Sequence, residues 1–144
     1  MKIDNKKAYF DYDIKDTIEA GINLTGPEVK SIRANQADLT GSHVRIVGNE
    51  VFLINAKIYQ YKFAKVENYD EKRTRKLLLH RREIISLKSK IEGSEMTLVP
   101  VSLYTKRGVI KVEVGIAKGK KKYEKKEAIK KRDITRDIER EFGV

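Results

Sequence analysis

Two groups of basic residues are the part of this sequence best suited to chemistry, and that chemistry is the binding of phosphates. The first group is Arg73-Thr74-Arg75-Lys76, which leads into three leucines, His80 and then Arg81-Arg82. The second begins at Lys118 and continues to the end of the chain, with lysine and arginine outnumbering acidic residues. Basic side chains at such positions can hold phosphates while a histidine or an exposed leucine packs on an unstacked base.

Residues suited to catalysis are scarce. His43 and His80 are the only histidines, lie far apart in the sequence and have no serine or cysteine nucleophile motif beside them. The segment 26–31 contains a Lys-Ser pair but lacks the glycine spacing of a phosphate-binding loop. The chain has no cysteine, and no His, Asp and Glu residues show metal-ligand spacing. We therefore expect no enzymatic activity, no metal and no cofactor.

Length and charge favour one small domain with a polyanionic partner. The 144 residues are enough for one hydrophobic core, and the formal net charge is +11. Such a charge can also serve solubility or thermotolerance alone, but here the positive residues cluster. The first residues lack the apolar region of a signal peptide, and no apolar stretch approaches the ~20 residues that span a membrane. We expect a cytoplasmic protein with no membrane contact, and a monomer, since no long apolar seam is present.

Aromatic residues and one acid add to the candidate surface. Tyr9, Phe10 and Tyr12 follow Lys6-Lys7, an arrangement that could stack bases, although we expect at least two of these rings in the core. Glu19 is unusual in a chain whose partner repels carboxylates. It can accept base amino groups or orient nearby lysine or arginine side chains.

Short strands and two helices must position these residues. The patterns predict strand character over Tyr9–Ile14 and Gly21–Leu24 with an irregular middle, hairpins of His43–Val47 with Val51–Asn55 and of Met96–Tyr104 with Val109–Ala117, an extended Lys57–Val66, and a loop over Tyr69–Lys76. One predicted helix begins at Gly26-Pro27-Glu28 and ends at Ala34-Asn35. A second covers Leu77–Glu92 and ends at Gly93. On that second helix one of the three consecutive leucines must face outward, and we choose Leu78; Leu77 and Leu79 can equally be core.

The strand pattern predicts a small barrel. Ile110, Val112, Val114 and Ile116 alternate with Lys111 and Glu113, as expected for an antiparallel strand buried on one side. Five or six such strands with two short helices indicate a closed or nearly closed antiparallel barrel that ends at about Ala117. Beyond it, Ile134, Ile138 and Phe142 form an apolar stripe one residue wide. So thin a stripe predicts a segment that is unfolded when free and helical when bound.

Six sequence runs, in this order and spread over most of the chain, resemble the SsrA-binding protein family, also called small protein B (SmpB). They are Asn5-Lys6-Lys7-Ala8, Glu19-Ala20-Gly21-Ile22, Leu24-Thr25-Gly26, Glu28-Val29-Lys30-Ser31-Ile32-Arg33, residues 73–80, and Val114 to Lys121. The resemblance implies a mainly β, OB-like barrel of about six antiparallel strands with two to three helices. It places an RNA-binding barrel at residues 1–122 and a basic C-terminal tail at 123–144.

The resemblance also implies a function. Family members are adaptors that bind the tRNA-like domain of transfer-messenger RNA (SsrA RNA) and deliver it to stalled ribosomes for trans-translation, which rescues the ribosome and tags the peptide. The ribosomal contacts are expected at the small-subunit decoding centre and messenger channel, where the tail becomes helical. The alternative is a structural ribosomal or translation-associated RNA-binding protein, which would stay on ribosomes constantly.

The family match and the basic clusters together give the expected binding residues. Those expected to contact the RNA are Asn5, Lys6, Glu19, Arg75, Lys76, Leu78, His80, Lys118, Lys120 and Lys121. Those expected to contact the ribosome from the tail are Lys125, Lys126, Lys130, Lys131, Arg132, Arg136 and Arg140. The chain departs from the family at Glu124-Lys125-Lys126, which replaces an Asp-Lys-Arg triplet and loses an arginine's bidentate reach. The tail is also shorter than in some relatives.

Overall fold

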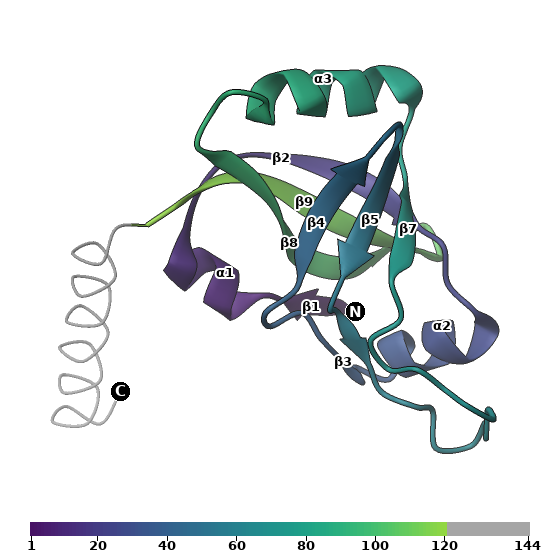
Figure 1. Ribbon diagram of the computed structural model, residues 1–144. Coiled ribbons are helices and arrows are strands. Elements are labelled where there is room, and N and C mark those ends of the chain that lie inside the picture. Colours follow the sequence, from purple (N-terminus) through teal and green to yellow (C-terminus); the bar gives the residue numbers. More distant parts are fainter. Residues whose placement is uncertain (121–144) are drawn as a thin grey trace, which may run out of the picture.

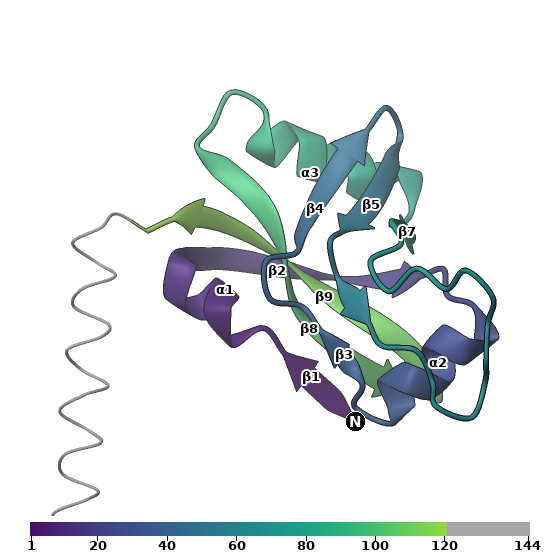
Figure 2. The same ribbon diagram turned by 60° about the horizontal axis from the view of Figure 1, so that its bottom comes forward.

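The computed structural model describes residues 1–120, whose strands form a closed antiparallel sheet (Figures 1 and 2). The strands are β1 (Lys2–Asp4), β2 (Tyr12–Ile22), β3 (Ala37–Asp38), β4 (His43–Val47), β5 (Glu50–Ile54), β6 (Lys57–Ile58), β7 (Arg75–Leu78), β8 (Met96–Lys106) and β9 (Val109–Gly119). The helices are α1 (Lys6–Asp11), α2 (Gly26–Arg33) and α3 (Arg81–Ile91). The sheet order is β1-β8-β4-β5-β7-β2-β9, and β8 also pairs with β9, which closes a ring and confirms the predicted barrel.

Two tight hairpins supply much of this ring, as the sequence predicted. Gly48-Asn49 joins β4 to β5, with Val47 opposite Glu50. Arg107-Gly108 joins β8 to β9, and both residues have positive φ (51° and 78°). Two positive φ values are the mark of a turn whose twist matches that of the paired strands. The ring closes between β4 and β8 where Val44 lies opposite Leu98.

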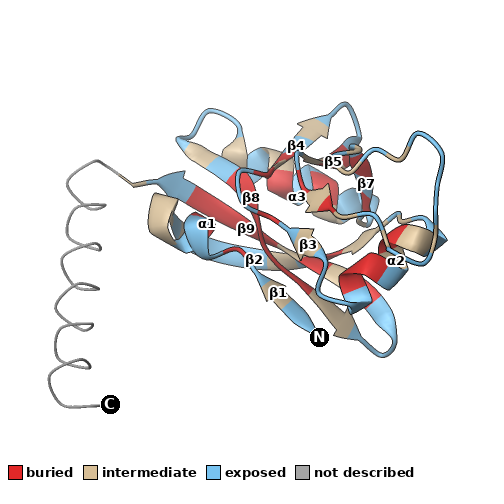
Figure 3. Ribbon diagram, turned by 90° about the horizontal axis from the view of Figure 1, so that it is seen from below, coloured by how far each residue is buried: buried red, intermediate tan, exposed pale blue. Residues whose placement is uncertain are grey.

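The core fills the barrel and is closed at its ends by helices. Ile110, Val112, Val114 and Ile116 of β9 are buried, as their alternation predicted. Ile84 and Leu87 of α3 pack into the same cluster from one end, and Ile32 of α2 packs into it as well. Figures 1 and 3 show α3 over one end of the barrel and α2 toward the other, each with its buried residues turned inward.

Helix α1 covers the outside of the barrel and corrects the prediction of a strand from Tyr9. The Asn5 side chain caps this helix by accepting from the Ala8 N–H (3.3 Å), and its amide donates to the carbonyl oxygen of Pro100 (2.8 Å). Ala8 then packs on Val99 and Ala117 in a second small cluster. The cap favours a helix here despite the strand-forming residues, because the Asn5 side chain accepts from the Ala8 N–H, a donor in the first helical turn.

The following strand is longer than predicted. β2 is continuous from Tyr12 to Ile22, whereas the sequence indicated an irregular middle. Pairing with β9 along almost its full length holds the polar residues in extended form, with a bulge between Ile14 and Asp16. Tertiary pairing has overridden local strand propensity here.

The segment before α3 also differs from its prediction. Arg75 and Lys76 were expected in a loop, and Leu77 and Leu78 in a helix; all four form β7, with Arg75 and Leu77 buried and the other two exposed. The helix begins at Arg81, where the His80 N–H donates to the Glu83 carboxylate (2.9 Å). Of the extended segment predicted over 57–66, only Lys57–Ile58 is a strand.

A buried ion pair connects α2 to β7. Glu28 and Arg75 are 1% and 0% exposed, and their side chains meet at 2.6 Å through two guanidinium nitrogens on one carboxylate oxygen. The other carboxylate oxygen accepts from Arg73 (2.6 Å) and from the Thr25 N–H (2.9 Å). Arg75 also donates to the carbonyl oxygens of Ala56 (2.8 Å) and Glu71 (3.2 Å). One guanidinium thus holds a helix, a strand and two points of a long loop together.

Burial alone would raise the pKa of the Glu28 carboxyl, but hydrogen bonds from Arg73, the Thr25 N–H and Arg75 outweigh it and hold the pKa below the ordinary value of 4.5. A carboxyl whose pKa is lowered in the folded state stabilises the fold above its unfolded pKa. We therefore expect this contribution to be complete at neutral pH. It is lost as the pH falls below 4.5 and through the folded pKa of Glu28.

Replacing Arg75 with methionine should destabilise the protein by about 3–5 kcal/mol, because it leaves a buried carboxylate short of its main partner. Urea unfolding at pH 7 measures this free energy. The double variant Glu28→Leu/Arg75→Met should recover part of the loss, since no uncompensated charge remains. A single variant as stable as the parent would contradict this account of the pair.

Candidate RNA-binding surface

The candidate surface lies on the outer wall of the barrel, where β2 runs between β7 and β9. Gly21 of β2 lies opposite Leu78 on one side and Lys111 on the other. A Cβ atom at Gly21 would lie 3.1 Å from the Leu78 Cβ, so the leucine packs over the space that a side chain at position 21 would occupy. These three residues line a groove of about 470 Å³ together with Glu19, Leu79 and His80. The wall therefore brings Glu19, Leu78 and His80 together, although they are far apart in the sequence.

Leu78 is the apolar centre of this surface. Its side chain is 53% exposed, and it also borders two further grooves, one toward Lys76 and Arg81 and one toward Arg33 and Val109. The choice of Leu78 as the outward leucine is confirmed, but the reason is strand alternation rather than a helical turn. Leu77 is buried, and Leu79 packs partly against the core.

Glu19 is held in place by its neighbours on β8. Its carboxylate accepts a hydrogen bond from the Tyr104 hydroxyl and lies 3.4 Å from the Lys106 ammonium. The Tyr104 hydrogen bond is the main cause that lowers the pKa of Glu19; desolvation opposes it, and the contact with Lys106 lowers the pKa further. Burial and the same hydrogen bond raise the pKa of Tyr104 above its usual value. Glu19 is thus an ionised, oriented acceptor, as the sequence suggested, and Tyr104 is a partner that sequence reasoning missed.

Basic residues surround this acceptor and the leucine. Lys76 is exposed beside Leu78 and pairs with Glu50 (3.0 Å). His80, Arg81 and Arg82 follow as exposed residues where α3 begins. Phosphates of a bound strand could be held along both sides of the leucine.

A second basic group lies at the other end of the β2–β9 ribbon. Lys118 pairs with Glu95 (3.1 Å), and Lys120 donates to the carbonyl oxygen of Tyr9 (2.9 Å) at the end of α1. Asp13 lies opposite Lys118, and eight residues of strand at ~3.3 Å each separate it from Gly21. The two groups of predicted RNA contacts are therefore about 25 Å apart along one ribbon.

Two of the predicted RNA contacts are unsuited to that role. Arg75 is fully buried in the ion pair with Glu28. Asn5 is 4% exposed and uses its side chain on the α1 cap and on Pro100. Arg75 holds elements together inside the barrel and Asn5 holds α1 against β8, structural roles that a basic or polar residue type alone cannot reveal. Lys121 and all predicted tail contacts lie outside the described residues.

The aromatic residues near α1 are less buried than expected. Tyr9 is 52% exposed, Phe10 and Tyr12 are partly exposed, and none of the three joins the core fully. Tyr12 packs against the small cluster of Ala8, Val99 and Ala117. The expectation of two core rings was therefore wrong, because a helix rather than an inward strand face carries Tyr9 and Phe10.

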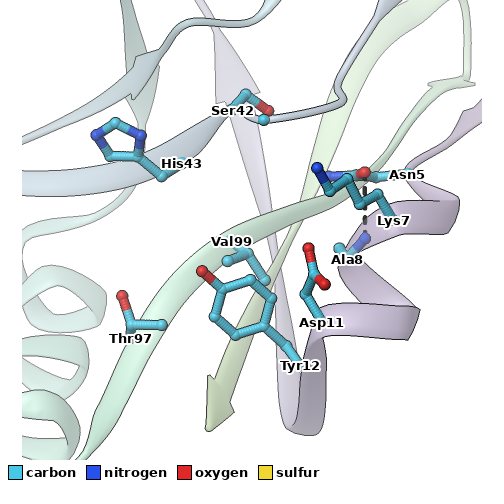
Figure 4. A pocket seen from close by; sticks show the side chains of 10 residues that line it. Asn5, Lys7, Ala8, Asp11, Tyr12, Ser42, His43, Thr97 and Val99 are labelled. Atoms are coloured by element: carbon cyan, nitrogen blue, oxygen red, sulfur yellow. Dashed lines mark hydrogen bonds between the residues drawn. The ribbon is translucent and has the colours of Figure 1, made fainter. Parts of the chain in front are cut away.

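A cleft of about 330 Å³ lies beside α1, where Lys7, Asp11 and Tyr12 face His43 and Thr97 (Figure 4). Sequence reasoning missed it because its walls come from three segments far apart in the chain. Within residues 1–120, no group of three or more histidine, aspartate and glutamate side chains could hold a metal ion. Over the same residues, no helix is long and apolar enough to cross a membrane.

Comparisons with known proteins agree over almost the whole chain. A family model described as SmpB protein matches residues 2–143. A relative named SsrA-binding protein from Chloroflexus aggregans is 53% identical over 138 residues (95% of this chain, 87% of the relative), and one from Thermosipho africanus is 50% identical over 135 residues (93% and 91%). A solved chain from "tmRNA-SmpB: a journey to the center of the bacterial ribosome" has a TM-score of 0.70 and 43% identity, covering 89% of this chain and 94% of that chain.

Replacing Tyr104 with phenylalanine should release the Glu19 carboxylate without disturbing the fold, since only a surface hydroxyl is removed. The pKa of Glu19 should rise toward the ordinary value of 4.5, because its largest lowering cause is gone. NMR titration of the Glu19 carboxyl carbon measures this pKa. Lys106→Met should raise it less, and an unchanged titration in Tyr104→Phe would show that the hydroxyl does not hold Glu19 in solution.

Proposed function

The chain belongs to the SmpB family, and from this premise we propose that it binds the tRNA-like domain of transfer-messenger RNA and delivers that RNA to stalled ribosomes for trans-translation. Relatives at 53% and 50% identity carry the name SsrA-binding protein, and the similar solved chain is described as tmRNA-SmpB in the bacterial ribosome. In this role the protein is a cytoplasmic RNA-binding adaptor and not an enzyme. Its partners are transfer-messenger RNA and the ribosome.

The observation that carries this proposal is an exposed leucine beside a fixed carboxylate on a basic wall. Leu78 presents an apolar side chain on which an unstacked base can pack, and Glu19 is an ionised acceptor suited to base amino groups. Lys76, Lys111 and His80 stand around them to meet phosphates. The family resemblance implies contact with the elbow of the tRNA-like domain, and we propose that Leu78 and Glu19 meet unstacked bases there.

The proposed RNA contacts differ from those expected from sequence. We retain Lys6, Glu19, Lys76, Leu78, His80, Lys118, Lys120 and Lys121, and add Lys106 and Lys111 from the wall. Tyr104 positions Glu19. Arg75 and Asn5 are left out of the proposed contacts, because Arg75 is engaged in the ion pair with Glu28 and Asn5 in the cap of α1.

We also propose that the chain divides its work between two parts. The barrel, residues 1–122, binds the RNA, and the segment 123–144 contacts the small ribosomal subunit through Lys125, Lys126, Lys130, Lys131, Arg132, Arg136 and Arg140. Support for this division comes from the basic composition of the segment and from its position after the last strand of the ring.

Replacing Leu78 with aspartate should weaken binding of the tRNA-like domain by about tenfold or more, because one base contact is lost and a negative charge faces phosphates. Fluorescence anisotropy with the labelled domain measures the Kd. Ile85→Asp is the matched control, since Ile85 is 57% exposed on α3, lines none of the three grooves that Leu78 borders and receives the same change. Equal losses in both variants would contradict a specific role for Leu78. Glu19→Arg should weaken binding as well, through loss of the acceptor.

Deleting residues 131–144 should leave binding of the tRNA-like domain intact and abolish peptide tagging on stalled ribosomes, because the deleted residues are proposed to act only on the ribosome. The Kd for the domain and a reconstituted tagging assay measure the two effects separately. A truncated chain that loses its RNA affinity would overturn the proposed division of work.

A further inference from the structure

The long connection between β6 and β7 carries exposed aromatic rings beyond the surface already described. Phe63 is 76% exposed, more than any other large apolar residue in the described part of the chain. The rings of Phe63 and Tyr61 pack edge to face, with their centroids 5.5 Å apart and an angle of 69° between their planes. The connection extends beside α2, away from the barrel (Figures 1 and 2). An exposed Phe63 beside a partly exposed Tyr61 leaves apolar ring surface in water, which costs free energy, so a ligand for the rings is the simplest explanation.

Lysines accompany these rings. The Lys62 ammonium lies 4.9 Å from the Phe63 ring centroid, and the Lys30 ammonium of α2 lies 5.9 Å from that of Tyr61. At the start of the connection, Lys57 lies 4.9 Å from the ring of Tyr59. Between residues 57 and 66 the sequence has no acidic residue. Rings interleaved with ammonium groups suit a ligand with flat apolar faces and regular negative charge.

The backbone presents these rings from an ordered base. The Tyr69 hydroxyl donates to the carbonyl oxygen of Ile58 (2.8 Å), and the Ile58 N–H donates to the carbonyl oxygen of Glu71 (2.9 Å). A turn then closes across the rings, where the Ala64 N–H donates to the carbonyl oxygen of Tyr61 (3.0 Å). Ordering in advance lowers the conformational cost of binding.

The rings are continuous with the Leu78 surface through the basic face of α2. Lys30, which lies over Tyr61, is three residues from Arg33 and therefore shares a helix face with it. Arg33 lines one groove with Leu78 and donates to the carbonyl oxygen of Gly108 (3.1 Å). A path of basic and aromatic groups thus leads from the proposed elbow contact to Phe63.

We propose that Tyr61 and Phe63, with Lys30 and Lys62, form a second site that stacks unpaired bases of single-stranded RNA. This site extends the proposed function and rests on it, because the RNA that reaches the rings is the one proposed to bind at the Leu78 surface. The lysine beside each ring favours RNA over an apolar protein surface, which would leave the ammonium groups without partners. The bases stack on the open side of the Phe63 ring, and Lys30 and Lys62 meet the adjoining phosphates.

The test uses the full chain and a single-stranded oligoribonucleotide of about 12 nucleotides that contains 2-aminopurine, whose fluorescence reports stacking. Phe63→Ala should bind it about five- to tenfold more weakly, with loss of the fluorescence change. Phe63→Tyr should bind as the parent does, because it keeps a ring. Val66→Ala is the matched control: Val66 is an exposed apolar residue of the same connection without a ring, and its loss should have no effect.

Three results would overturn this second site. One is unchanged binding of the oligonucleotide by Phe63→Ala, and another is parent-like binding and fluorescence in Phe63→Leu, which would show that apolarity rather than a ring matters. The third is ribosome binding lost in Phe63→Ala with oligonucleotide binding intact, which would assign the rings to a protein partner. The isolated tRNA-like domain separates the two proposals: Phe63→Ala should bind it normally and Leu78→Asp weakly. Normal binding of the tRNA-like domain by Leu78→Asp would refute the proposed function, but it would leave the proposed stacking of the oligonucleotide on Phe63 standing.

Discussion

The ion pair between Glu28 and Arg75 is the interaction on which the candidate surface depends. Side chains alternate along a strand, so the buried position of Arg75 in β7 also decides the direction of Leu78. With Arg75 inward, Leu77 enters the core while Lys76 and Leu78 face solvent. A register slip of one residue would bury Lys76 and Leu78 and expose the guanidinium. Because Glu28 can meet Arg75 only in the observed register, the ion pair selects the outward leucine.

Replacing such a pair by apolar residues of similar volume often leaves a protein as stable or more so, so stability alone is a weak explanation for it. Its geometry offers a better one. Arg75 satisfies Glu28, Ala56 and Glu71 at once, and thereby holds the residue before β6 and the later part of the connection between β6 and β7. An apolar core residue would fill the space without choosing among these partners. The pair therefore contributes specificity of arrangement, which a binding surface assembled from separate elements requires.

Much of the barrel could be predicted from sequence, because its hairpins and its one-sided strands carry local signals. Gly48 and Gly108 mark the turns, and the alternation from Ile110 to Ile116 marks a strand with one buried face. The failures share a cause. Arg75 was expected in a loop as an RNA contact, because an arginine is rarely buried without a partner and its partner here, Glu28, lies 47 residues away.

The candidate site shows the same limit. Leu78 and Glu19 could be chosen from sequence, one because one of three consecutive leucines must face outward and one as an acid in a basic chain. Tyr104 could not, since a tyrosine near the end of an apolar strand is more often core. Its role follows only from the pairing of β2 and β8 with β9, which brings its hydroxyl to the Glu19 carboxylate. Residues that contact a ligand can carry a sequence signal, whereas residues that position them carry only a structural one.

The β2–β9 ribbon gives the separation of the two basic groups a physical meaning. β9 pairs with β2 and with β8 along most of its length, in the two longest ladders of the ring, so the ribbon is among the parts of the barrel least able to bend. One end presents Leu78 and Lys111, and the other presents Lys118, about 25 Å away at ~3.3 Å per residue. Leu78 and Lys118 are therefore held at a fixed separation by the barrel itself. An adaptor that must place an RNA relative to a second partner needs such a rigid spacer, and two flexible basic patches of the same charge would bind RNA without orienting it.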